Sequence, residues 1–122
     1  MSEPRSFDPA AVERLVRLGG QKFALDMIDL FSSYGGQKMA EARQAQQAGN
    51  LPALAIAAHP LKSSAGNVGA VRVQELAAQV EQAATEQQAE PAGSLLDELE
   101  TAFTEAVKLL EQEKTKLANP PS

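Results

Sequence analysis

Apolar residues recur at three- and four-residue spacing along almost the whole chain, and no segment shows the sustained alternation that is typical of a strand. Long amphipathic helices joined by short turns favour an antiparallel bundle. The predicted fold class is therefore all-α: an antiparallel four-helix bundle with one or two short additional N-terminal helices. The periodicity places helices at about residues 9–18, 21–34, 37–48, 51–68, 71–88 and 95–117.

Residues that favour helix ends set the expected boundaries. Asp8 is a plausible N-cap for the first helix, which the pair Gly19–Gly20 ends. The pair Gly35–Gly36 predicts a second break or kink, because glycine weakens a helix interior. Ser94, followed three residues later by Asp97, resembles a capping box and places the start of the last helix after the turn "EPAGS".

Length and composition describe one domain without disulfides. The chain has 122 residues and no cysteine, so we expect a helical bundle over residues 7–117 with flexible tails at 1–6 and 118–122. A formal net charge of −5 argues against a nucleic-acid binder. No apolar run approaches a membrane span, and the N-terminus lacks a secretory pattern. We therefore expect a cytoplasmic protein without membrane association, and a monomer because each helix has one principal apolar stripe.

The only histidine of the chain lies in the stretch "AAHPLKSSAGNVGA", residues 57–70. On a helical wheel, five residues at alternating four- and three-residue spacing form one narrow stripe that should face the core: Leu54, Ala58, Leu61, Ala65 and Val68. His59 lies roughly 140° from the centre of this stripe. The imidazole should therefore be exposed to solvent.

An exposed imidazole is available in its neutral form as a nucleophile near neutral pH. Lys62 lies one turn further along and could stabilise a new negative charge, while Ser63 and Gly66 leave room for an incoming group. Judged on the residues alone, however, one surface histidine in a helical protein is more often only a surface residue. Composition and spacing favour that plain interpretation by a modest margin.

The segment "AHPLKSSAGNVGA" resembles the phosphoacceptor signature of histidine-containing phosphotransfer (HPt) domains. His59, Lys62, Ser63 and Gly69 fall on signature positions. The flanking segments "VERLVRLGGQKFALDMIDLF" and "VQELAAQVEQAA" also resemble the family, the second through Leu76 and Glu81, so the similarity covers roughly residues 7–110. The chain departs from the usual signature at Ser63, where glycine is common, and at Pro60, directly after the histidine.

The resemblance implies a phosphorelay intermediate. His59 would accept a phosphoryl group from a receiver-domain aspartate and pass it to another receiver, with Lys62 stabilising the charge. The partners would be response regulator receiver domains and a sensor (hybrid) histidine kinase. The chain itself would bind no metal or other cofactor, since Mg²⁺ would come from the receiver, and it would have no kinase activity of its own. Five residues form the expected receiver-docking surface: Ala55, Ile56, Ser63, Gly66 and Gly69.

Charge is distributed in a way that suits an acidic partner near His59. Residues 51–80 carry a formal net charge of +1, whereas residues 81–113 carry −8.

Other functions remain to be weighed against a phosphorelay. The chain could be a helical interaction module that binds a receiver or kinase without being phosphorylated, or the phosphoacceptor segment of a larger kinase. A metal or haem bundle is disfavoured by the single histidine and the absence of Glu-x-x-His. A hydrolase that uses a general base is disfavoured because no titratable residue near His59 in the sequence pairs with it.

Overall fold

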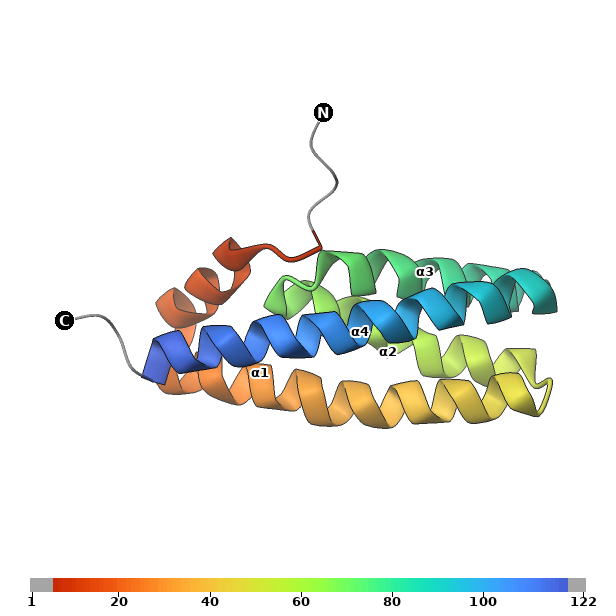
Figure 1. Cartoon of the computed structure of the whole chain (residues 1–122), viewed down its shortest axis with the longest axis horizontal. Helices are drawn as coiled ribbons and strands as arrows, with labels where there is room; N and C mark the ends of the chain where they lie inside the picture. Colours follow the sequence, from red (N-terminus) through yellow and green to blue (C-terminus); the bar gives the residue numbers. More distant parts are fainter. Residues whose placement is uncertain (1–5, 119–122) are drawn as a thin grey trace, which may run out of the picture.

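The computed structural model describes residues 6–118, so residues 1–5 and 119–122 of the expected tails lie outside the described residues. Its helices are α1 (Pro9–Gln47), α2 (Leu51–Val68), α3 (Val71–Thr85) and α4 (Ala89–Ala118). Each packs against the next along the chain, and α4 returns to pack against α1 (Figure 1). The predicted all-α four-helix bundle is confirmed. No helix in the described part of the chain is long and apolar enough to cross a bilayer.

The first turns of α1 form the additional short helix that the sequence predicts. The path of α1 is interrupted at Gly20, whose φ of 93° and ψ of 177° are not helical, so Pro9–Gly19 turns away from the rest of α1. Figure 1 shows this segment at the end of the bundle where α4 finishes. Asp8 caps it, accepting a hydrogen bond from the Ala10 backbone N–H at 3.1 Å. The Asp8 N–H donates to the Gly69 carbonyl at 2.8 Å and so ties the segment to the end of α2.

The predicted break at Gly35–Gly36 is wrong, because α1 continues through both residues to Gln47. Gly35 is buried, and a Cβ placed on it would lie 2.6 Å from Cε1 of Phe103 on α4. Phe103 in turn packs on Phe31, with ring centroids 5.2 Å apart. Gly35 therefore permits a close approach between α1 and α4, and this packing outweighs the helix-propensity cost of about 1 kcal/mol.

The expected capping box at Ser94 and Asp97 is also wrong, because α4 begins at Ala89 and both residues lie inside it. Pro91 falls in the first turn, where the N–H that proline lacks would have no helical partner. The carboxylate of Asp97 instead accepts a hydrogen bond from Nη2 of Arg43 at 2.7 Å and joins α4 to α1.

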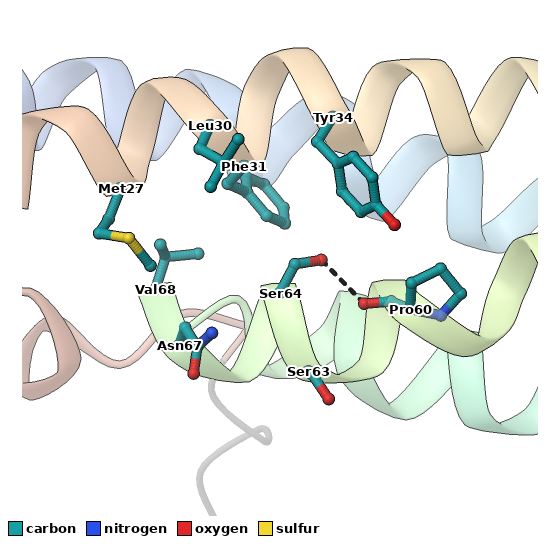
Figure 2. Close-up of a pocket in the computed structure, with 9 residues that line it drawn as sticks. All are labelled: Met27, Leu30, Phe31, Tyr34, Pro60, Ser63, Ser64, Asn67 and Val68. Carbon is teal, nitrogen blue, oxygen red and sulfur yellow. Dashed lines mark hydrogen bonds between the residues drawn. The ribbon is translucent and has the colours of Figure 1, made fainter.

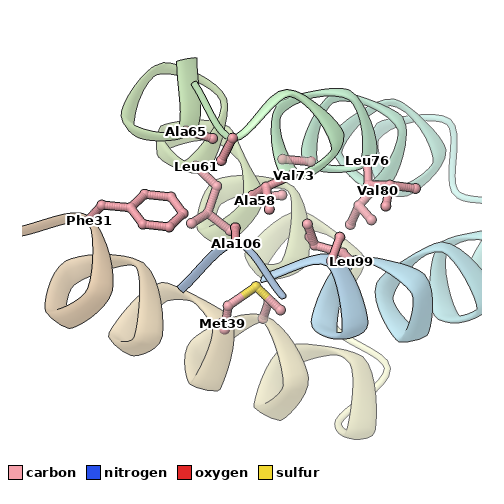
Figure 3. Close-up of a cluster of buried hydrophobic side chains, with 14 of the residues drawn as sticks. Phe31, Met39, Ala58, Leu61, Ala65, Val73, Leu76, Val80, Leu99 and Ala106 are labelled. Carbon is pink, nitrogen blue, oxygen red and sulfur yellow. The ribbon is translucent and has the colours of Figure 1, made fainter. Parts of the chain in front are cut away.

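The apolar stripe predicted on α2 is confirmed as the central seam of the core. Each of its five members has at most 1% of its surface exposed: Leu54, Ala58, Leu61, Ala65 and Val68. Figure 3 shows Leu61 beside Phe31 of α1 within a buried cluster that also contains Leu99 of α4. No polar or charged residue is buried among residues 6–118, so the interior depends on apolar packing alone.

Replacing the two adjacent glycines of α1 separately tests the role of Gly35. Gly36→Ala should be neutral or mildly stabilising, since open space surrounds its Cβ position. Gly35→Ala forces its new methyl group against Phe103. Its unfolding free energy in a urea titration should be lower than that of Gly36→Ala by about 1–3 kcal/mol. Equal stability of the two variants would show that α1 and α4 are not in close contact here.

Candidate functional site

His59 lies on the outer face of α2, with 66% of its side chain exposed, as the helical wheel predicts. Nδ1 of the imidazole lies 2.6 Å from Oε2 of Glu81 on α3, a contact that orients the ring. The hairpin of α2 and α3 thus brings together two residues that are 22 positions apart in the sequence. The prediction that no titratable residue pairs with His59 is wrong in three dimensions.

Glu81 binds two partners at once. Its Oε2 faces the imidazole, and its Oε1 forms an ion pair with Nζ of Lys62. The hydrogen bond from Lys62, and to a smaller extent that from His59, lowers the pKa of the Glu81 carboxyl below its ordinary value of 4.5, although burial opposes the shift. The carboxyl group is therefore ionised at neutral pH.

Ionisation of Glu81 determines which imidazole nitrogen is free. A carboxylate can only accept hydrogen bonds, so Nδ1 of His59 must carry the proton that lies between the two groups. In the neutral imidazole the other nitrogen, Nε2, then holds an unshared electron pair. With two thirds of the side chain exposed, the site presents one nucleophilic nitrogen with a fixed tautomer.

The other expected site residues differ in how far they are exposed to solvent. Ser63 and Ile56 are exposed, Ile56 by 72%, while Ala55 and Gly66 are half-buried. Gly66 faces α3, and a Cβ placed on it would lie 2.9 Å from Nε2 of Gln74. The expectation that Gly69 contributes to a docking surface is wrong, because Gly69 is buried.

Gly69 has a structural role at the end of α2. Its φ of 80° is the left-handed conformation that favours glycine, and it caps the helix. A Cβ at this position would collide with the carbonyl oxygen of Asp8. The glycine therefore allows the N-terminal segment to lie directly against the turn between α2 and α3.

An apolar groove runs between α1 and α2, and its lining includes Pro60, the residue that directly follows His59 in the sequence (Figure 2). Its volume is about 480 Å³. The lining residues are Met27, Leu30, Phe31, Tyr34, Pro60, Ser63, Ser64, Asn67 and Val68. The apolar spacing of residues 21–34 predicts that Phe23 and Leu30 face the core, but they are 37% and 55% exposed. The available signal was an excess of apolar residues on this part of α1, more than one core-facing stripe can bury.

The described residues contain no cluster of three or more histidine, cysteine, aspartate or glutamate side chains that could hold a metal ion. The exposed imidazole and the neighbouring ammonium group suit nucleophilic attack by Nε2 of His59, with Lys62 available to a developing anion.

Comparison with known proteins places this geometry in a family context. The family model described as "Hpt domain" matches residues 26–113, a span that contains His59, Lys62 and Glu81. Among solved structures, the chain is similar to histidine-containing phosphotransfer protein B (HptB) from Pseudomonas aeruginosa PAO1, with a TM-score of 0.86 and 23% sequence identity over 93% of this chain and 98% of that one. At this identity the likeness concerns the fold. No curated protein sequence matches the chain.

The fixed tautomer can be observed directly, since the chain has one histidine and its ring signals need no assignment. In long-range ¹H–¹⁵N NMR spectra at pH 8, wild-type His59 should show a protonated Nδ1 and an unprotonated Nε2. Glu81→Ala removes the acceptor and should shift the ring towards the Nε2–H tautomer. Glu86→Ala removes a carboxylate at the end of α3 that accepts a hydrogen bond from Gln82 and makes no bond to His59, so it should leave the spectrum unchanged. An unaltered tautomer in Glu81→Ala would contradict the assignment.

The lowered pKa of Glu81 also predicts how stability depends on pH. A carboxyl group whose pKa falls on folding stabilises the native state above its unfolded-state value of 4.5, and this contribution disappears as the pH drops through the folded-state value. The stability difference between wild type and Glu81→Gln should therefore be present above pH 4.5 and shrink as the pH falls below that value. Urea titrations of both proteins at each pH measure this difference in unfolding free energy. A difference that grows in acid would show that folding raises the pKa of Glu81 instead of lowering it.

Proposed function

Because the chain belongs to the Hpt domain family of phosphotransfer proteins in two-component signalling, we propose that His59 accepts a phosphoryl group from the aspartyl phosphate of a receiver domain and passes it to a second receiver. Members of this family carry phosphoryl groups and are not kinases. A sensor (hybrid) histidine kinase would stand upstream and supply the first receiver. Mg²⁺ would come with the receivers, since their phosphorylation sites hold it.

One observation carries the proposal: Nδ1 of the exposed His59 lies 2.6 Å from Oε2 of Glu81, so the carboxylate would hold the imidazole proton on Nδ1 and leave Nε2 free. Nε2 attacks phosphorus, an N–P bond forms, and the P–O bond to the receiver's aspartate breaks with its electron pair leaving on the carboxylate. The imidazole gains positive charge in this step. Glu81, already on Nδ1–H, stabilises that charge where it develops.

Lys62 is suited to the phosphoryl oxygens. Its ammonium group lies close enough to contact the same carboxylate as His59, and about a third of its side chain is exposed. A charge-assisted hydrogen bond from an ammonium group to a phosphoryl oxygen is stronger than a neutral one. Lys62 would therefore turn towards the phosphoryl group as it arrives, while Glu81 keeps its bond to the imidazole.

The reaction is reversible with the same groups. Protonation at Nδ1 keeps the phosphorylated imidazole cationic, which makes it a good leaving group for the next receiver's aspartate. No group on this chain has to gain or lose a proton between the two transfers. The site is therefore suited to a carrier that is loaded by one receiver and unloaded by another.

Phosphotransfer from receivers tests the function. A panel of purified receiver domains is charged with radiolabelled acetyl phosphate and Mg²⁺, repurified, and mixed with this chain. At least one receiver should transfer label to the wild-type protein in an acid-labile, base-stable form, and His59→Gln should acquire none. Absence of label from every receiver, with binding retained, would favour the alternative of a non-phosphorylated interaction module.

The role of Lys62 is tested in the same assay with Lys62→Ala. The transfer rate should fall about tenfold or more, as expected for the loss of one hydrogen bond to a charged group of about 1.5–3 kcal/mol. The matched control is Lys22→Ala, which removes an exposed lysine of α1 that pairs with Asp26 at 3.0 Å and lies outside the site. Circular dichroism should show both variants folded. Equal rates for the two variants would remove Lys62 from the mechanism.

A further inference from the structure

Gly20 bends α1 with a backbone conformation that is readily adopted only by glycine. Its φ of 93° and ψ of 177° interrupt a chain that is helical on both sides, over residues 9–19 and 21–47. A side chain strongly disfavours this combination of angles, whereas glycine has no Cβ and tolerates it. Open space surrounds the Cβ position of Gly20. The backbone conformation, and not a close contact, therefore requires glycine at the bend.

The N-terminal segment, residues 9–19, packs on the bundle only because of this bend. Figure 1 shows the segment (red) turned out of line with the rest of α1 (orange). Its buried face consists of three residues: Ala11, Val12 and Leu15. Just before the segment, the Ser6 carbonyl accepts a hydrogen bond from the N–H of Arg72 on α3 at 3.3 Å. The segment thus fills a specific site at the end of the bundle and reaches it through one residue.

The apolar pattern of α1 continues in phase through the bend. Six apolar residues are separated by three, four or seven positions and would share one face of a straight helix: Val12, Val16, Phe23, Met27, Leu30 and Tyr34. The sequence is therefore compatible with a second shape of α1, in which Gly20 is helical and the helix is unbroken. In that shape the N-terminal segment would extend about 16 Å beyond the bend, at 1.5 Å per residue.

Straightening α1 in a single chain would be costly, because it exposes the buried face of the N-terminal segment and empties its site on the bundle. A second copy of the chain, straightened in the same way, offers the identical empty site. If each copy places its segment on the other, every contact of the segment is restored and only the two bends are changed. This is the situation in which exchange of an identical element costs little.

We propose that Gly20 is a hinge through which two copies of this chain exchange their N-terminal segments and form a dimer. The bent glycine keeps the wild-type chain monomeric at low concentration, and a straight α1 joins two copies at high concentration. The match to the family model begins at residue 26, beyond the hinge, so the exchanged segment lies outside the matched part of the bundle. Each half of the dimer therefore keeps its own His59 on its own α2.

Two glycines of α1 form a matched pair for the test. Open space surrounds the Cβ position of both, but Gly36 is helical and Gly20 is not. Gly20→Ala disfavours the bend and favours the straight helix, whereas Gly36→Ala changes helix propensity alone. Because each dimer contains two hinges, its Kd in sedimentation equilibrium should fall about a hundredfold or more in Gly20→Ala. Gly36→Ala should sediment as wild type does.

Cross-linking distinguishes an exchanged dimer from two copies that associate by their surfaces. The chain has no cysteine, so Ser6→Cys and Arg72→Cys each introduce a single thiol, at two positions joined by a backbone hydrogen bond. Two Gly20→Ala chains, each with one of these cysteines, are mixed in urea, refolded together and oxidised. Exchange brings the two thiols together, so a disulfide-linked pair of chains should form. Thr85→Cys, at the other end of α3, replaces Arg72→Cys as the control and should not cross-link.

The same pair of cysteines in the wild-type background gives a second measurement that does not depend on the folding of Gly20→Ala. Cross-linking should follow refolding of the mixture at millimolar concentration and be much weaker at micromolar concentration. Its absence at both concentrations would overturn the inference for the natural sequence.

Two results with folded Gly20→Ala would also overturn the inference. An equal mass for Gly20→Ala and Gly36→Ala at every concentration would show that residue 20 is not a hinge. A dimer that forms no disulfide between Ser6→Cys and Arg72→Cys, or that cross-links equally at Thr85→Cys, would show association without exchange. None of these measurements involves phosphoryl transfer, so their outcome is independent of the proposed function.

Discussion

The orientation of α2 about its own axis is the constraint on which the site depends. Successive residues of a helix are separated by 100° around its axis. If the core-facing stripe moved by one residue, the whole of α2 would rotate by that angle and all its side chains would point elsewhere. At most 1% of the surface is exposed at Leu54, Leu61 and Val68. Truncating one such leucine in a well-packed core costs about 2–5 kcal/mol, so the seam strongly opposes rotation. His59 points outward because the opposite face of α2 is held in the core.

Glu81 converts this orientation into a defined chemical state. With two thirds of the His59 side chain exposed, its bond to Glu81 is screened by water and contributes little to the stability of the bundle. Its importance lies in selecting the tautomer of the imidazole and in placing a negative charge where positive charge develops. The interaction requires the close pairing of α2 with α3, which the small side chains of the seam and the turn at Gly69 permit.

The sequence predicts the features of this protein that depend on local spacing. The seam of α2, the exposure of His59 and the Asp8 cap all follow from residues within a few turns of each other. Features that depend on distant residues were missed. Glycine at position 35 reads as a helix breaker until Phe103 is found against it, 68 positions along the chain.

The same limit applies within the candidate site. The pairing of Glu81 with His59 depends on how two helices are placed, and so does the burial of Gly69 beneath Asp8. The groove beside Leu30 arises because α1 and α2 do not close fully over an apolar stripe that is wider than the core requires. Periodicity reports which residues share a helix face, but the partner of that face is decided by tertiary packing.

Pro60 gives the clearest reason to treat the two flanks of α2 separately. A proline in a helix interior costs about 3 kcal/mol or more, and the core seam gains nothing from it because Pro60 lies outside the seam. The polar flank gains nothing either, since His59, Lys62 and Glu81 need only a regular helical spacing to meet. Pro60 instead lines the apolar groove between α1 and α2. The two flanks of α2 therefore differ in character, because one holds the reactive groups and the other lines an apolar groove.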